Sequence, residues 1–284
     1  MNDLVATIRA DLPPDLDVCV SLVLYRTALA EVERAIAQVL RSERRVHVVV
    51  IDNSVPALDL RRFRDAGVTI VAAGANLGYG RGHNLALEAS RGRCRYHLVM
   101  NTDLEFDSDV VSGLAGFMDA HPDVGLAMPR IVYPDGSLQR LCRLLPDPVD
   151  LIGRRFFKRT AWANERNRRY EFHGWSYDTV AEFPFLSGCF MFLRRSTLDA
   201  VGHFDERFFL FAEDLDLSRR INAVARTLYV PEHSVMHEYR SQARPSLSRL
   251  RMAIVSLTRY FFKWGWIFDP ARDAANRKAL RQFE

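Results

Sequence analysis

Two kinds of hydrophobic pattern alternate along the first 120 residues of the chain. Continuous apolar runs rich in β-branched residues are typical of strands buried on both faces of a parallel sheet, and they occur at 18–25, 46–51, 68–72 and 96–100. Between these runs, apolar residues recur at helical spacing, which predicts helices at 28–40, 58–66, 84–90 and 109–120. The repeated order of strand and helix predicts an α/β fold with a right-handed, doubly wound sheet.

Polar clusters follow three of the predicted strands. They are Asp52-Asn53-Ser54, NLGYGRGHN at 76–84, and Asn101-Thr102-Asp103. Each cluster by itself could be a turn, because Asp, Asn, Ser and Gly all favour turns, and the last could also cap a helix, although Asp107 and Ser108 lie nearer to one. Ligands of doubly wound sheets bind beyond the carboxyl ends of the strands. Three clusters at successive strand ends therefore predict a binding edge.

The segment 202–221, GHFDERFFLFAEDLDLSRRI, carries a candidate catalytic residue. Asp214 shares a helical stripe with the apolar residues at 210, 217 and 221. A carboxylate on such a stripe is costly unless it is paired or opens on a polar cleft, and in a partly apolar cleft it suits a general base. Asp216 has a simpler interpretation, since Arg219 and Arg220 stand three and four residues further on and can form surface ion pairs with it.

Composition narrows the class of protein. With 284 residues, 48% hydrophobic and 26% charged, the chain can bury a large core, which excludes a disordered protein. The net charge of +4 suits an anionic small substrate or an acidic membrane, and the scattered basic residues, without a reading motif, argue against nucleic-acid binding. The four cysteines lack Cys-x-x-Cys spacing, and no apolar run reaches the ~20 residues of a spanning helix. We therefore expect a cytoplasmic protein that is soluble or peripheral on the inner face of the plasma membrane.

The order of these motifs resembles that of the inverting family 2 glycosyltransferases of the GT-A fold, especially their rhamnosyltransferase-like branch. The resemblance covers about residues 17 to 240 and rests on VSLVLY, IDNS, NLGYGRGHN, MNTD, LSGCFMFLRR, FDERFFLFAEDLDLSRRI and a later His. It implies a nucleotide-sugar-binding GT-A domain at 1–240, a Rossmann-like sheet flanked by helices. The remaining residues, 241–284, are expected to form a C-terminal amphipathic helical extension.

The resemblance also implies a role for each candidate site residue. Asp103 matches the metal-binding aspartate of the D-x-D element, whose first position is Asn101 here, and Asp214 matches the catalytic base. His237 matches a histidine near the metal or the diphosphate, although from the sequence alone a structural histidine is equally consistent, and Glu105 is a weaker candidate metal ligand. The residues expected to bind the nucleotide are Asp52, Asn53, Asn76, Gly78, Arg81, Asn84, Asn101 and Thr102. Those expected beside the acceptor or donor sugar are Gly188, Glu213 and Arg194.

These roles predict a metal-dependent inverting transferase with Mg²⁺ or Mn²⁺ as its cofactor, because a cation can neutralise the charge that develops on a diphosphate leaving group. The resemblance favours dTDP-L-rhamnose as donor and a lipid-linked or polysaccharide acceptor. Alternatives are a UDP-hexose or UDP-galactofuranose donor, or a non-catalytic nucleotide-sugar-binding protein. A nucleotidyltransferase is less consistent, because the chain has no N-terminal glycine-rich loop of the expected pattern.

Two amphipathic stretches bear on the acceptor. Residues 154–169 interleave basic residues with Phe156, Phe157 and Trp162, and predict either a solvated helix packed on the core or a contact with anionic lipid. Apolar residues at spacings of three and four over 247–268, with Arg and Lys between them, predict a helix of about six turns. This helix could pack on the core, pair with a second subunit in a homodimer, or lie on a membrane.

Overall fold

The computed structural model describes residues 1–63, 67–107, 109–150, 160–238 and 247–284. In this part of the chain, nine strands form one sheet in the order β3-β2-β1-β4-β10-β6-β11-β5, with β8 paired to β11. The nine strands are β1 (Leu16–Leu24), β2 (Val46–Asp52), β3 (Val68–Ala72), β4 (Cys94–Met100), β5 (Leu104–Glu105), β6 (Val124–Val132), β8 (Ala181–Glu182), β10 (Phe190–Arg194) and β11 (Arg226–His237). A small second sheet pairs β7 (Cys142–Arg143) with β9 (Phe185–Leu186).

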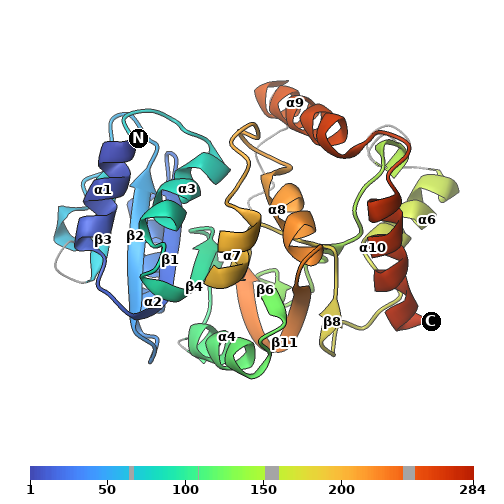
Figure 1. Cartoon of the computed structure of the whole chain (residues 1–284), viewed down its shortest axis with the longest axis horizontal. Helices are drawn as coiled ribbons and strands as arrows, with labels where there is room; N and C mark the ends of the chain where they lie inside the picture. Colours follow the sequence, from blue (N-terminus) through green and yellow to red (C-terminus); the bar gives the residue numbers. More distant parts are fainter. Residues whose placement is uncertain (64–66, 108, 151–159, 239–246) are drawn as a thin grey trace.

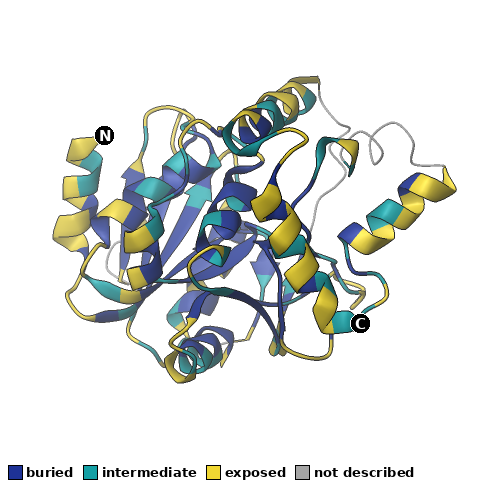
Figure 2. Cartoon of the chain, turned by 45° about the vertical axis from the view of Figure 1, so that its right-hand side comes forward, coloured by how far each residue is buried: buried dark blue, intermediate teal, exposed yellow. Residues whose placement is uncertain are grey.

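Helices cover both faces of the sheet (Figure 1). They are α1 (Asn2–Asp11), α2 (Leu29–Leu40), α3 (Tyr79–Ala89), α4 (Asp109–Ala120), α6 (Ala161–Tyr170), α7 (Arg195–Val201), α8 (Glu213–Asn222), α9 (Leu247–Trp264) and α10 (Pro270–Leu280). Alternate residues of β2 point to opposite faces, so that Val49 and Ile51 belong to the apolar cluster that contains α1 and α3 residues, while Val48 and Val50 belong to the cluster that contains the α2 residues. Burial on both faces explains why these strands are continuously apolar (Figure 2).

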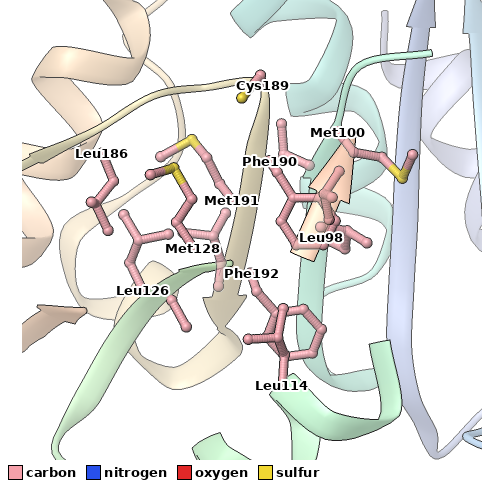
Figure 3. Close-up of a cluster of buried hydrophobic side chains, with 14 of the residues drawn as sticks. Leu98, Met100, Leu114, Leu126, Met128, Leu186, Cys189, Phe190, Met191 and Phe192 are labelled. Carbon is pink, nitrogen blue, oxygen red and sulfur yellow. The ribbon is translucent and has the colours of Figure 1, made fainter. Parts of the chain in front are cut away.

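The first half of the sheet confirms the predicted parallel arrangement. Strands β3, β2, β1 and β4 run parallel, whereas β10 runs antiparallel to both β4 and β6. Strand β10 lies in the centre of the core, where Phe190 and Phe192 pack among Leu98, Leu126 and other apolar side chains (Figure 3). The reversal of β10 places its first residues, next to Cys189, at the carboxyl end of β4.

Two predicted helices in the first half have different boundaries. Of the helix expected at 58–66, the described residues form a single 3-10 turn at Arg61–Phe63, and residues 64–66 lie outside the described residues. The backbone N–H of Leu58 donates to the Asp52 side chain. Helix α3 begins at Tyr79, five residues before the predicted start. Of the glycines interpreted as a loop, Gly78 is the N-cap of α3, and Gly80 and Gly82 lie within its first turns, where a Cβ at Gly82 would approach Val23 Cγ2 to 2.8 Å. Helix α4 starts as predicted, but its candidate cap Ser108 is outside the described residues.

The C-terminal region forms two helices rather than one. Helix α9 ends at Trp264, Gly265 has a φ of +107°, and the Asp269 side chain accepts a hydrogen bond from Arg272 N at the start of α10. None of the described helices is long and apolar enough to cross a membrane. In the other basic stretch predicted from the sequence, residues 154–169, Phe156 and Phe157 lie outside the described residues. Trp162 lies on α6 and is half exposed, at 51%.

Candidate active site

The polar clusters meet at one edge of the sheet. The register pairs Leu24 with Asp52 at the ends of β1 and β2, and Phe190 with Met100 at the adjacent ends of β10 and β4. The backbone N–H of Asn101 donates to the carbonyl of Cys189 at 2.9 Å, which joins the segment after β4 to the segment before β10. The predicted binding edge therefore gathers residues from both halves of the chain.

Asp103 and His237 come together through strand pairing. Residue 237 ends β11 opposite Leu104 of β5, and Glu238 N donates to Asp103 O at 2.9 Å. His237 Nε2 lies 3.3 Å from Asp103 Oδ1, and the His237 side chain is buried. His233, the other candidate, points instead to helix α4, with Nδ1 3.7 Å from Asp109 Oδ2. An oxygen and a nitrogen donor thus face each other, although the described residues contain no group of three or more such donors.

Glu213 and Asp214 begin helix α8 on the other side of this edge. Asp214 Oδ2 accepts a hydrogen bond from Gly188 N at 2.8 Å, and Oδ1 accepts one from Leu215 N at 2.8 Å. A side chain at position 188 would not fit, because its Cβ would lie 2.8 Å from Asp214 Cβ. The glycine therefore permits the close approach that fixes the carboxylate.

Both carboxyl groups have raised pKa values. Burial, and then the neighbouring Asp214 charge, raises the pKa of Glu213 well above its usual value of 4.5. Burial also raises the pKa of Asp214, against the lowering effects of the Gly188 and Leu215 amides and of the Arg143 guanidinium. A carboxylate whose pKa is shifted toward neutrality is a better proton acceptor than an ordinary aspartate.

Tyr79 and Cys189 lie next to Gly188, the residue whose backbone N–H is bonded to Asp214. The Tyr79 hydroxyl donates to Gly188 O at 2.7 Å. Burial, and then the charges of Cys189, Glu213, Asp214 and Asp103, raise the Tyr79 pKa well above its usual value. Burial raises the pKa of Cys189 to about 12, with smaller contributions from Asp103 and Asp214. Asn101 N is bonded to Cys189 O and Asp214 to Gly188 N, so the segment that carries Asp103 and the start of α8 contact the same two residues and form one site.

The part of the edge that was predicted to bind the nucleotide is built from hydrogen-bonded turns. Asp52 is buried, and its two carboxylate oxygens accept from Ser54 N at 2.8 Å and Leu58 N at 2.6 Å. Asn53 Nδ2 donates to Gly78 O at 3.1 Å, and Asn76 Oδ1 accepts from Gly78 N at 3.0 Å. Gly78 has a φ of +83°, and a Cβ there would lie 2.3 Å from Phe209 O, so only glycine fits. Asp52 thus forms a turn, which was the alternative interpretation of the Asp52-Asn53-Ser54 cluster.

Four of the predicted contact residues are bonded to other parts of the protein. Asn84 donates to Phe204 O at 2.9 Å and accepts from Phe204 N at 3.0 Å, and Arg81 forms a 3.4 Å ion pair with Glu206. Thr102 Oγ1 donates to Glu31. Glu105 forms a 3.4 Å ion pair with Arg34 on helix α2, and so is turned away from the Asp103 and His237 pair.

Arg194 lies at the opposite end of the sheet from the site. Because β10 is antiparallel to β4, Arg194 is paired with Tyr96, four residues before Met100. Its guanidinium donates to the carbonyls of Val124 at 2.7 Å and Met118 at 2.6 Å, at the end of helix α4. The expectation that Arg194 contacts a sugar is therefore wrong. Arg143 and Tyr79, which the sequence analysis did not select, lie at the site, and Arg143 had no recognisable motif.

Buried ion pairs attach α9 and α10 to helix α8. Asp216 is fully buried and accepts from Lys263 Nζ at 2.6 Å, Arg220 Nε at 2.8 Å and Trp264 Nε1 at 2.8 Å. Arg219 does not pair with Asp216 as predicted, but donates two hydrogen bonds to Asp269, at 2.7 and 2.6 Å. The helix that carries Glu213 and Asp214 is thus held from its outer side by the C-terminal helices.

Residues 20–202 of the chain match the Glycosyl transferase family 2 domain. N-acetylglucosaminyl-diphospho-decaprenol L-rhamnosyltransferase of Mycobacterium tuberculosis, strains CDC 1551 and ATCC 25618, is 30% identical over 229 residues, which cover 72% of this chain and 71% of the relative. The domain match ends before Glu213, Asp214 and His237, so the placement of these three residues comes from the structure.

Solved glycosyltransferase structures have the same fold. The mannosyltransferase PcManGT from Pyrobaculum calidifontis, in complex with GDP-Man and Mn²⁺, aligns with a TM-score of 0.61 at 17% identity over 96% of this chain and 73% of that one. GalNAc-T7 with UDP, GalNAc and Mn²⁺ aligns with a TM-score of 0.58 at 15% identity over 84% of this chain and 47% of that one. This chain therefore spans about half of the GalNAc-T7 chain. At such identities the likeness concerns the fold alone.

Proposed function

Because the chain belongs to glycosyl transferase family 2 and has the GT-A fold of glycosyltransferases, we propose that it transfers L-rhamnose from dTDP-L-rhamnose, with inversion, to a lipid-linked or polysaccharide acceptor in cell-surface glycan synthesis. The observation that carries the reaction type is the placement of the partly buried Asp214 carboxylate and of the Asn101–Asp103 segment against the same residues, Gly188 and Cys189. The rhamnosyl donor is supported by the M. tuberculosis relative, whose name states an L-rhamnosyltransferase with an N-acetylglucosaminyl-diphospho-decaprenol acceptor.

Asp214 is the proposed general base. Its two amide hydrogen bonds, from Gly188 and Leu215, fix the orientation of the carboxylate, and its raised pKa favours proton uptake. It would take the proton of the acceptor hydroxyl while the hydroxyl oxygen forms a bond to the anomeric carbon and the nucleoside diphosphate leaves from the opposite face. The buried Glu213 beside it would hold its own proton and offer a hydrogen bond to a sugar hydroxyl.

Asp103 and His237 are the residues that would hold Mg²⁺ or Mn²⁺. Their donor atoms, a carboxylate oxygen and an imidazole nitrogen 3.3 Å apart, fit such an ion, and the imidazole favours Mn²⁺. Two protein ligands suffice where substrate phosphates and water complete the coordination. The ion would supply positive charge that stabilises the diphosphate leaving group. Glu105 is not included, because Arg34 holds it elsewhere.

We also propose that α9 places the enzyme on an anionic membrane, at the inner face of the plasma membrane, where a lipid-linked acceptor resides. The stretch 247–268 has four basic residues and no acidic one. Phe262, Ile267 and Phe268 expose 76%, 88% and 85% of their surface. Exposed aromatic and aliphatic groups together with arginine suit a lipid headgroup boundary. Ser256 on the inner side of α9 bonds Leu210 O at 2.8 Å, next to the start of α8.

A thermal-shift panel tests the nucleotide and metal parts of the proposal. The wild-type chain is mixed with dTDP, UDP or GDP, with and without Mn²⁺, and one nucleotide should raise the melting temperature further when Mn²⁺ is present. Asp103→Ala should abolish the additional rise. Asp214→Asn should keep it but lower sugar transfer by at least about 100-fold, because proton removal by a positioned base contributes on that order.

The transfer assay uses dTDP-rhamnose and a diphosphoprenyl N-acetylglucosamine acceptor, with products identified by mass spectrometry. Full turnover by Asp214→Asn would contradict the assignment of the base. A shift with UDP alone and transfer from a UDP-hexose or UDP-galactofuranose would replace the rhamnosyl donor. Nucleotide binding without transfer to any acceptor tested would favour a non-catalytic nucleotide-sugar-binding protein.

A further inference from the structure

The Gln139 side chain contacts both the imidazole ring and the backbone carbonyl of His237. The Gln139 side-chain nitrogen donates to His237 O at 2.8 Å and to Val132 O at 3.4 Å, while Gln139 Oε1 lies 2.9 Å from His237 Nδ1. Both side chains are buried, Gln139 at 4% and His237 at 5% exposure. The backbone N–H of Gln139 donates to Ile131 O at 2.9 Å, so the glutamine is anchored to the end of β6.

These contacts determine which end of the Gln139 amide faces the imidazole. Carbonyl oxygens accept hydrogen bonds and cannot donate them, so the side-chain atom next to the carbonyls of His237 and Val132 must be the NH₂ group. The opposite atom, which faces Nδ1, is then the amide oxygen. An amide oxygen is an acceptor only, so His237 Nδ1 must carry the hydrogen of this bond.

A hydrogen on Nδ1 leaves Nε2 of a neutral imidazole with a lone pair. Nε2 is the atom that lies 3.3 Å from Asp103 Oδ1. We propose that Gln139 is a positioning residue that holds His237 in its Nδ1–H tautomer, so that Nε2 faces Asp103 as a ready cation ligand. The tautomer follows from the hydrogen bonds alone, whereas its purpose rests on the proposed function of Asp103 and His237 as metal ligands.

Gln139 would thereby also influence which metal ion the site prefers. A ligating imidazole is ordinarily oriented by a hydrogen bond from its other nitrogen, and loss of that partner typically lowers metal affinity by about 10- to 100-fold. Loss of the Gln139 oxygen would free the ring to adopt the Nε2–H tautomer, which presents a hydrogen to the cation site. Because imidazole favours Mn²⁺ over Mg²⁺, weaker ligation by His237 should also reduce the preference of the site for Mn²⁺.

The test reads the tautomer directly in the full-length chain. Histidine is labelled with ¹⁵N, metal is removed with EDTA, and two-bond ¹H–¹⁵N spectra at mildly alkaline pH identify the nitrogen that carries hydrogen, with His237→Gln assigning the signal. We expect the Nδ1–H form in the wild type and the Nε2–H form in Gln139→Leu. Gln38→Leu is the matched control, because Gln38 is also buried and its side chain bonds backbone groups, Leu104 O and Phe106 N, rather than a histidine among the described residues.

Metal affinity is measured on the same proteins by electron paramagnetic resonance of Mn²⁺ in the presence of dTDP. Gln139→Leu should bind Mn²⁺ about 10- to 100-fold more weakly. An Nε2–H signal in the wild type would overturn the proposal without any variant, and so would an unchanged tautomer in Gln139→Leu. If the wild type bound no Mn²⁺ while its tautomer was Nδ1–H, the metal part of the proposed function would be overturned and the hydrogen-bond assignment supported.

Discussion

At the scale of single residues, Glu213 and Asp214 are neighbours in the chain with different surroundings. Each oxygen of Asp214 accepts an amide hydrogen bond, whereas Glu213 Oε2 is buried and has no hydrogen-bond partner among the described residues. The two residues just before them, Phe211 and Ala212, have φ values of 69° and 67°, which are unfavourable for side chains larger than glycine. Costly groups of this kind concentrate at sites kept for function rather than for stability.

The pH dependence of stability should reveal the buried Glu213. The folded chain holds a proton on Glu213 that the unfolded chain releases above its usual pKa of 4.5. The free energy of unfolding therefore falls as the pH rises from 4.5 toward the raised pKa of the folded state. Glu213→Gln removes this loss, so the variant should gain about 1 to 3 kcal/mol over the wild type at pH 8 and nothing near pH 4.5.

Urea unfolding at a series of pH values measures this difference. Glu165→Gln serves as the control, because the Glu165 side chain is 79% exposed, and its curve should run parallel to that of the wild type. A Glu213→Gln curve that also ran parallel to the wild type would show that the Glu213 carboxyl is not held protonated by the fold.

At the scale of elements, helix α8 depends on the two helices that follow it in the chain. Arg219 and Asp269 are both buried, and the guanidinium also lies 4.1 Å from the centre of the Trp264 ring. Burial raises the pKa of Asp269, but the hydrogen bonds and charge of Arg219 outweigh it and leave the pKa below its usual value. The pair joins helix α8 to the junction between α9 and α10. The division at residue 240 stays a prediction, but α9 and α10 hold the helix that carries Glu213 and Asp214.

Breaking this ion pair should be costly, and removing it completely should not be. Asp269→Asn leaves the Arg219 charge buried without its anion, which should lower the free energy of unfolding by about 3 to 5 kcal/mol. The double variant Arg219→Met/Asp269→Leu removes both charges and should recover most of that loss. Urea unfolding measures both changes.

Asp59 provides a matched control for this experiment. It also makes two hydrogen bonds to an arginine, Arg61, but both side chains are exposed, at 64% and 81%. Asp59→Asn should leave the unfolding midpoint unchanged, because exposed pairs contribute little. An Asp269→Asn midpoint equally close to that of the wild type would mean that the C-terminal helices do not hold α8.

At the scale of the whole molecule, the apolar stripe predicted on 247–268 is divided between two surfaces. Tyr260 and Phe261 are buried against the segment before α8, whereas Leu247, Ile254 and Phe268 are exposed. The exposed outer side of α9 can be followed in Figure 2. The helix thus packs on the core with one face and leaves the other to a partner, which we propose is an anionic bilayer.

Flotation with vesicles tests this surface. The wild type should float with phosphatidylglycerol-containing vesicles and not with phosphatidylcholine alone, and Phe262→Ser/Phe268→Ser should weaken binding by at least about tenfold, because each large side chain contributes more than 1 kcal/mol when buried. Val224→Ser is the control, since Val224 is 64% exposed at the far end of α8. Absence of flotation with a dimeric mass in sedimentation would replace the membrane by a second copy of the chain.

The local signals in the sequence were sufficient for much of the fold and for part of the site. Strands β1 to β4 and helices α2 and α4 follow the hydrophobic periodicity, because burial on both faces or along one stripe dictates residue type at short range. The polar residues at the strand ends and Asp214, a charged residue on an apolar stripe, were recognisable because they interrupt these hydrophobic patterns. The glycines of α3 were misassigned because their function, close packing against Val23 and Phe204, involves residues far away in the chain.

Only the tertiary structure decided which of these residues meet. The direction of β10 depends on its neighbours β4 and β6, and it sends Arg194 to the far end of the sheet while it brings Gly188 to Asp214. The pairing of β5 with β11 selects His237 over His233, and the end of β6 supplies Gln139. Sequence periodicity reports how each segment is buried, whereas strand direction and register are set by contacts between segments, which no local pattern encodes.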